Sequence, residues 1–196
     1  VMGTPIADCC GGQGAHGANY LGPEHSGVQL AVDPANPLPF ATPGGALYLE
    51  EQQAQFGLLS KLNRLTAIEY PDDPVLRARI KSYELAFRMQ TAVPDVMQFD
   101  VETPTTQKLY GLDNDTTRTF GQQCLAARRL VEAGVRVVTL AYGRWDWHGR
   151  PHGTNFENAR DHLPALDQGI TTLMDDLKDR GMDKDVTVLV WGEFGR

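Results

Sequence analysis

The sequence predicts an α/β protein in which a parallel β-sheet is covered by helices. Two short apolar segments have the composition of strands, residues 135–141 and residues 186–191. Between them lies about a long helix's worth of residues with apolar side chains at helical spacing. A strand–helix–strand unit of this kind crosses over right-handed and leaves its strands parallel and adjacent. The near-continuous apolar character of the second strand fits a strand covered on both faces.

Composition and charge fit a globular protein and argue against two classes of partner. The chain has 196 residues, of which 41% are hydrophobic and 22% charged, so it can bury a sizeable core. Its formal net charge of −7 provides no basic field for nucleic acid or for an anionic membrane. No apolar run approaches the length of a membrane span. The three cysteines include the adjacent pair Cys9 and Cys10, and they form neither a disulfide framework nor a zinc-ribbon pattern.

Three regions follow one another along the chain. Residues 1–45 are a Gly- and Pro-rich irregular segment, and residues 46–134 are a helical region that packs on the sheet. Residues 135–196 are the strand–helix–strand unit that carries the candidate site. The chain begins without an initiator methionine and stops just past the second strand. We therefore expect it to be an internal part of a longer protein.

Apolar periodicity and capping residues place four helices. The first spans residues 49–65, and the second begins at Pro74 with Asp72 or Asp73 as its N-cap. The third spans residues 117–133 and ends at Gly134. The fourth spans roughly residues 155–180, is kinked or divided at Pro164, and ends at Gly181. The side chains expected on the buried faces of these helices are, in chain order, Phe56, Leu59, Leu62, Leu65, Leu76, Ile80, Tyr83, Phe87, Phe120, Cys124, Ala127, Val131, Leu163, Leu166, Ile170, Leu173 and Leu177.

Acidic motifs follow both predicted strands. Asp146 and His148 come after the first strand, and Glu193 comes after the second. Because parallel neighbouring strands end at one edge of the sheet, where open α/β sheets bind ligands, these side chains should converge. They suggest a metal site or a general acid/base site. The alternative is structural: a loop aspartate with an exposed histidine that caps a turn, and a glutamate that caps a helix or pairs with Arg196.

Basic side chains flank the acidic motifs. Arg144 and Arg196 could hold an anionic substrate group through paired hydrogen bonds, or they could only neutralise nearby carboxylates. His152 lies in a polar loop, where it could reach the same edge or remain solvated. His162, in the fourth helix near Pro164, is expected at the surface.

Several of these motifs resemble the Domain of Unknown Function 1501 (DUF1501) family of bacterial proteins. The run RRLVEAGVR at residues 128–136 matches the helix-to-strand junction of that family. Tyr20-Leu21-Gly22-Pro23 and Tyr110-Gly111 fit it more loosely. The remaining matches are Trp145-Asp146-x-His148, the Asn155-Phe156 helix start, Leu166-Asp167, and Gly192-Glu193-Phe194-Gly195-Arg196.

The resemblance implies a relation to the alkaline-phosphatase-like superfamily, which includes sulfatases and phosphatases, and therefore a portion of that fold. Sulfatase-like members end a similar unit with a metal-binding Asp-His pair, but this chain has Glu193-Phe194, so one ligand is missing. The superfamily places its nucleophile after an upstream first strand. The catalytic nucleophile is therefore expected upstream of these residues. The resemblance also suggests a periplasmic or exported protein.

Two functions remain open. The first is a metal-dependent hydrolase of sulfate or phosphate esters, with Asp146, His148 and Glu193 as ligands of a divalent cation. Calcium, magnesium or manganese would suit the carboxylates, whereas His148 favours zinc or another transition metal. Its substrate would be an anionic small molecule or a saccharide ester. The second is a non-catalytic binding or assembly module that retains the fold. The sequence leaves the substrate, the metal and the oligomeric state open.

Overall fold

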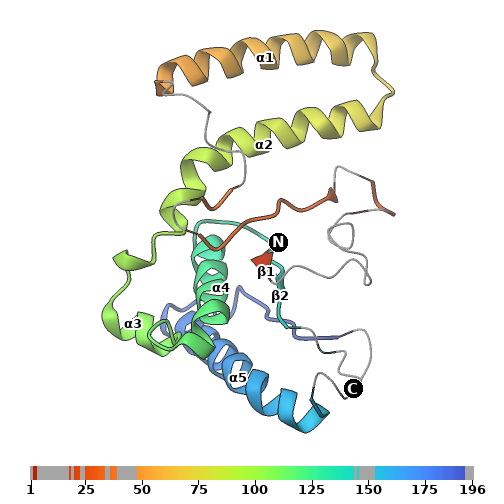
Figure 1. The fold of residues 1–196 in the computed structure, drawn as a ribbon. Helices are drawn as coiled ribbons and strands as arrows, with labels where there is room; N and C mark the ends of the chain where they lie inside the picture. Colours follow the sequence, from red (N-terminus) through yellow and green to blue (C-terminus); the bar gives the residue numbers. More distant parts are fainter. Residues whose placement is uncertain are drawn as a thin grey trace. The chain divides into compact units, whose positions relative to one another are not determined.

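The chain forms two compact units in this computed structural model. One unit comprises Val1 and Pro5–Asp95, and the other comprises Met2–Thr4 and Val96–Arg196. The structure describes residues 2–3, 18, 20–22, 25–33, 36–38, 48–143, 145 and 153–192. Figure 1 shows the elements of both units along the chain.

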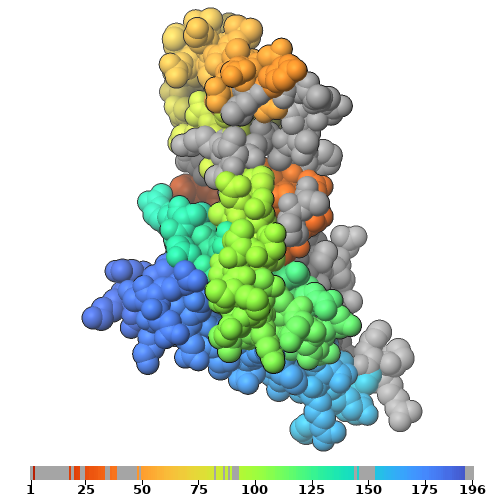
Figure 2. Space-filling model, turned by 90° about the vertical axis from the view of Figure 1, so that its left-hand side faces the viewer, coloured from red at the N-terminus to blue at the C-terminus, as the bar shows by residue number. Residues whose placement is uncertain are grey.

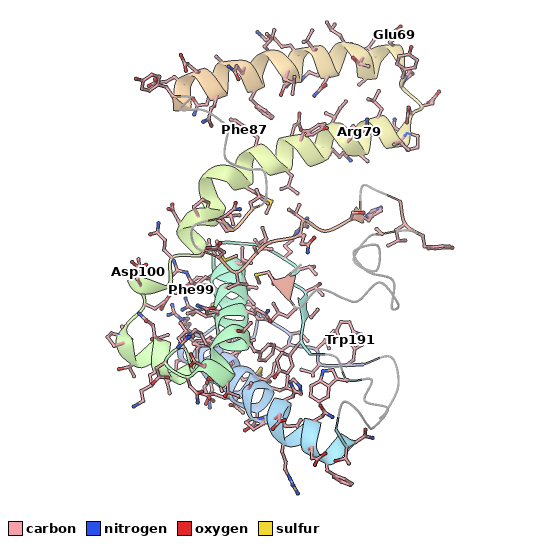
Figure 3. All side chains as sticks on the ribbon, viewed as in Figure 1. Glu69, Arg79, Phe87, Phe99, Asp100 and Trp191 are labelled. Carbon is pink, nitrogen blue, oxygen red and sulfur yellow. The ribbon has the colours of Figure 1, made fainter. Side chains whose placement is uncertain are left out.

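The first unit contains an antiparallel helical hairpin (Figure 1). Helix α1 spans Leu49–Glu69, and helix α2 spans Pro74–Val96, with its last residue in the second unit. Asp73 caps α2, because its Oδ1 accepts hydrogen bonds from the backbone N–H groups of Val75 and Leu76, at 2.9 and 3.0 Å. Phe56 and Phe87 stack between the helices with ring centroids 4.0 Å apart. Figure 3 shows Phe87 on the side of α2 that faces α1. The predicted cap and start of α2 are therefore confirmed.

The buried face predicted for α1 is wrong for three of its four residues. Phe56 is half-buried, but Leu59, Leu62 and Leu65 are exposed, Leu65 to 64%. The half-buried face of α1 consists of residues at helical spacing from Phe56, and some of them are polar, such as Asn63. Leucine spacing alone did not identify the inner face, because α1 has apolar residues on more than one side.

The second unit contains a 3₁₀ turn and three α-helices. The turn spans Phe99–Val101 (η4), α3 spans Pro104–Leu109, α4 spans Asp115–Glu132, and α5 spans Asn155–Asp179. Thr154 and Glu157 form a reciprocal capping box at the start of α5. Gly134 and Gly181 follow the ends of α4 and α5 with φ of +94° and +70°, as their predicted roles as helix stops require. Helix α5 is not divided at Pro164.

The core of the second unit lies between α4 and α5. Phe120, Cys124 and Ala127 are buried on α4 as predicted, whereas Val131 is half-buried. On α5 the buried residues are Ala165, Gly169, Leu173 and Leu177, and the predicted Leu163 is exposed. The small residues allow α4 to approach, since a Cβ at Gly169 would lie 2.6 Å from Phe120 Cδ1. Figure 2 shows α3 next to α5, where the side chains of Gln168 and Thr172 donate hydrogen bonds to Leu109 O.

Two short strands pair in this unit. Strand β1 (Met2–Gly3) lies parallel to β2 (Leu140–Ala141), with Met2 opposite Leu140. Met2 N donates a hydrogen bond to Thr139 O at 2.8 Å. Because the strands are parallel, the chain leaves both of them at the same edge.

The predicted parallel sheet covered by helices is wrong. In the described part of the chain only two-residue strands occur, and the neighbour of β2 comes from residues 2–3, not from residues 186–191. Residues 135–139 and 186–191 are not strands, and they expose Val137 to 80% and Trp191 (Figure 3) to 77%. Apolar composition predicted strands, but a strand also needs a backbone partner for its N–H and C=O groups, and composition does not supply one.

Close packing of α4 gives a stability prediction. A Cβ at Gly121 would lie 1.8 Å from the backbone oxygen of Tyr110, so Gly121→Ala should destabilise the second unit by about 1–3 kcal/mol. Gly57→Ala in α1 is the matched control, because a Cβ there meets nothing within 4 Å and the higher helix propensity of alanine should stabilise by up to about 1 kcal/mol. Urea unfolding followed by circular dichroism measures both. A Gly121→Ala variant as stable as wild type would refute the packing.

Candidate functional site

The chain makes a tight aromatic turn directly after β2. Gly143 has φ of +69°, a left-handed backbone conformation that residues other than glycine rarely adopt. The turn brings Trp145 back onto the backbone, where its indole Nε1 donates a hydrogen bond to Tyr142 O at 2.8 Å. Trp145 remains 38% exposed. The residue before Asp146 is therefore fixed to the end of the strand.

Helix α5 holds this turn through His162. The hydroxyl of Tyr142 donates a hydrogen bond to His162 O at 2.8 Å. The ring centroid of His162 lies 6.4 Å from that of Tyr142 and 6.3 Å from that of Trp145. Phe120 of α4 packs on Tyr142, with centroids 4.2 Å apart. We refer to Phe120, Tyr142, Trp145 and His162 as the aromatic cluster.

The observed environment of His162 differs from the one predicted from the sequence. The residue was expected at the surface, yet its ring is half-buried against two aromatic side chains. Burial also raises the pKa of Tyr142, which keeps its hydroxyl protonated as a hydrogen-bond donor. Spacing in the sequence could not predict the contact between Tyr142 and His162, because the two residues are 20 positions apart.

The predicted site residues themselves lie outside the described residues. They are Arg144, Asp146, His148, His152, Glu193 and Arg196. The structure describes Trp145, which directly precedes Asp146, and Gly192, which directly precedes Glu193. The expectation that Glu193 joins Asp146 rested on two adjacent parallel strands, and the described residues do not form that pair. Within the described ranges, no group of three His, Cys, Asp or Glu residues could hold a metal ion.

A second cluster of functional groups lies between α4 and α5, and its members come from three parts of the second unit. Arg128, in the middle of it, is only 1% exposed. Its Nε lies 2.9 Å from Asp176 Oδ2 and its Nη2 lies 2.8 Å from Glu102 Oε1. Its Nη1 donates a hydrogen bond to Glu132 Oε2 at 2.7 Å. The charged cluster consists of Glu102, Arg128, Arg129, Glu132, Asp176 and Arg180.

The charged cluster is internally balanced. Its three guanidinium groups face three carboxylates, so the formal charges cancel. Arg129 bonds to Glu102, and Arg180 reaches Asp176 at 2.7 Å and Glu132 at 2.9 Å. Each carboxylate therefore has at least two cationic partners, which offsets the cost of burying charge.

The pKa shifts agree with this pairing. Burial alone would raise the pKa values of Glu102 and Asp176, but hydrogen bonds and positive charge from the arginines lower both overall. The pKa of Tyr110 is raised, by burial first and then by the charge of Asp176. Its hydroxyl therefore stays protonated and donates to Asp176 Oδ2 at 2.9 Å. The cluster holds paired charges and a neutral donor, so we interpret it as a structural core.

Part of the charged cluster was visible in the sequence. Arg128 and Glu132, and likewise Asp176 and Arg180, are four residues apart on helices, which places each pair on one helix face. Helical spacing could not identify Glu102 as a member of the cluster, because its partners are more than 20 residues away. Its position is set by the 3₁₀ turn η4, which ends next to it.

The structure therefore defines a helical protein with a short parallel strand pair and a buried charged core. The model of the family described as a protein of unknown function (DUF1501) matches residues 1–196, so the chain belongs to this family. The comparisons with curated proteins and with solved structures gave no match. The predicted family is confirmed, and the relation to alkaline-phosphatase-like proteins stays a prediction. In the described part of the chain, none of the helices has the length and apolar character that crossing a membrane requires.

The charged cluster generates the second prediction. Arg128→Met should destabilise the protein by about 3–5 kcal/mol, because it leaves the carboxylates of Glu102 and Asp176 with fewer cationic partners. Arg118→Met on the same helix is the control. Its ion pair with Asp115 is largely exposed, and its loss should cost no more than about 1 kcal/mol. Equal effects of the two substitutions in chemical denaturation would show that the buried cluster does not support the fold.

Proposed function

We propose that the segment after β2 binds a divalent metal through Asp146 and His148, and that the protein is a metal-dependent hydrolase of sulfate or phosphate esters. The observation that supports this most is the aromatic turn. It fixes Trp145 at the end of a parallel strand, immediately before Asp146.

The donor set suits such a cation. Asp146 and His148 are two residues apart, so on an extended segment they would face the same side. A carboxylate and an imidazole fit zinc or manganese best, while calcium and magnesium would depend more on the carboxylates. Glu193 is the third proposed ligand because it lies in the motif Gly192-Glu193-Phe194-Gly195-Arg196, which resembles the family, and not because of a strand pair. When bound, the metal would polarise an ester oxygen and lower the pKa of a nucleophile.

The substrate proposed for this site is an anionic small molecule or a saccharide ester. Arg144, His152 and Arg196 would bind its sulfate or phosphate group, since guanidinium groups match the geometry of such oxyanions. An exported or periplasmic location, which the family resemblance suggests, would fit an enzyme that acts on such esters outside the cytoplasm.

The residue at position 194 supports a second candidate function. Phe194 stands where sulfatase-like proteins have a metal-binding histidine, so the ligand set is reduced. A chain with this change could retain the fold as a binding or assembly module without catalysis. Turnover of aryl sulfates or aryl phosphates that EDTA abolishes would favour the hydrolase. Metal binding without turnover would favour the module.

The third prediction tests the metal. The protein should bind a divalent cation, and the triple variant Asp146→Ala, His148→Ala, Glu193→Ala should bind it at least about 100-fold more weakly, since even changes behind metal ligands cost roughly 10–100-fold in affinity. Metal content by mass spectrometry and titration with Zn²⁺, Mn²⁺, Mg²⁺ and Ca²⁺ measure the effect, with circular dichroism as the folding control.

A matched triple variant separates a metal site from general loss of acidic groups. Asp183→Ala, His25→Ala, Glu50→Ala removes the same residue types at exposed positions and should bind metal as wild type does. Equal metal content in wild type and in the Asp146, His148, Glu193 variant would refute the site. So would a wild-type protein that binds none of the four cations.

A further inference from the structure

We propose that helix α1 is an interface between two copies of this chain, which pair through exposed apolar side chains. The leucine face of α1 consists of Leu58, Leu62, Leu65 and Ile68. Each of these side chains is more than half exposed, and spacings of four and three residues place them on one side of the helix. The helix packs on α2 through a different side, where Phe56 stacks on Phe87. A continuous exposed apolar stripe marks an interaction surface, whereas single exposed leucines need no explanation.

The leucine face is flanked by two charges that have no ionic partner in the described part of the chain. Lys61 and Glu69 are both exposed, and neither forms an ion pair with another described residue. They are eight residues apart on the helix, about 12 Å along its axis, which is too far for them to pair with each other. A second molecule can supply the opposite charge to each of them.

The residues of this surface are arranged symmetrically about Leu65. Leu62 and Ile68 lie three residues before and after it, and Lys61 and Glu69 lie four residues before and after it. In an antiparallel pair of α1 helices with a two-fold axis at Leu65, each residue meets the one at the same distance on the other side. Leu65 then packs on its own copy, Leu62 packs on Ile68, and Lys61 pairs with Glu69, and the last two contacts each occur twice.

This pattern favours a second copy over other occupants of the leucine face. A parallel pair would place Lys61 on Lys61 and Glu69 on Glu69, so that like charges would repel. A partner helix with charges of one sign would match only one of the two flanking residues. An antiparallel pair of identical helices neutralises both charges and covers the apolar stripe, as the self-complementary surface of a two-fold dimer requires.

The apolar part of the interface is tested by sedimentation velocity of the whole chain over a wide range of concentrations. We expect a wild-type dimer. Leu65→Glu should weaken it at least about 100-fold, because two leucines lose their burial and two carboxylates meet at the axis. Val137→Glu is the matched control, since it places the same charge on an exposed apolar residue of the second unit and should leave the dimer unchanged. Circular dichroism serves as the folding control.

The charged part of the interface is tested by reversal and mixing. Lys61→Glu and Glu69→Lys should each weaken the dimer about 10-fold at low ionic strength, because each variant alone forms two like-charge contacts. An equal mixture of the two variants should regain the wild-type affinity, because every charge in the mixed pair meets its opposite. Neither change should harm the helix. The first removes a like-charge neighbour of Arg64, and the second places a positive charge at the C-terminal end of α1.

Several results would overturn the proposal. They are a wild-type monomer at all concentrations, a dimer that survives Leu65→Glu, single charge variants that dimerise as wild type does, and a mixture that associates no better than its components. For a monomer, maleimide labelling of a Leu62→Cys variant, read by mass spectrometry, identifies the alternative. Protection would show that another part of this chain covers the leucine face, and full labelling would leave it for a different protein.

Discussion

The buried guanidinium of Arg128 is the constraint on which the second unit depends. A charge that is 1% exposed must be paired, and its carboxylate partners come from the segment after η4, from α4 and from α5. Pairing is directional, so together with the close packing of Phe120 on Gly169 it fixes how these segments meet. Glu102 and Asp176 also bond to Arg129 and Arg180, which spreads the restraint over both helices.

The same α4–α5 pair holds the aromatic cluster. The charged cluster lies toward the C-terminal end of α5, around Asp176, and the aromatic cluster lies toward its N-terminal end, around His162. Phe120 and Gly169 pack against each other in the core between them. One end of the helix pair is thus fixed by ion pairs, and the other supports a turn that leads into the proposed metal ligands. The charged cluster and the aromatic cluster therefore share one packed interface.

The sequence predicted the parts of this structure that depend on local signals. Asp73, Gly134 and Gly181 mark helix ends through groups within a few residues, and the bounds of α4 and α5 differ little from those expected. The prediction of strand pairing was wrong, because the partner of β2 lies at residues 2–3, in a segment without strand periodicity. The aromatic cluster was missed for the same reason, since its hydrogen bond joins Tyr142 to a histidine that looked like a surface residue on helical spacing alone.

The proposal that the end of β2 is a metal site is tested most directly by paramagnetic NMR. The indole N–H resonance of Trp145, assigned through Trp145→Phe, reports from the residue next to Asp146. Substoichiometric Mn²⁺ should broaden this resonance and those of the His162 ring, and diamagnetic Zn²⁺ in excess should restore them by displacing Mn²⁺. A Trp145 resonance that stays sharp at saturating Mn²⁺, while other parts of the protein broaden, would place the metal elsewhere and contradict the account.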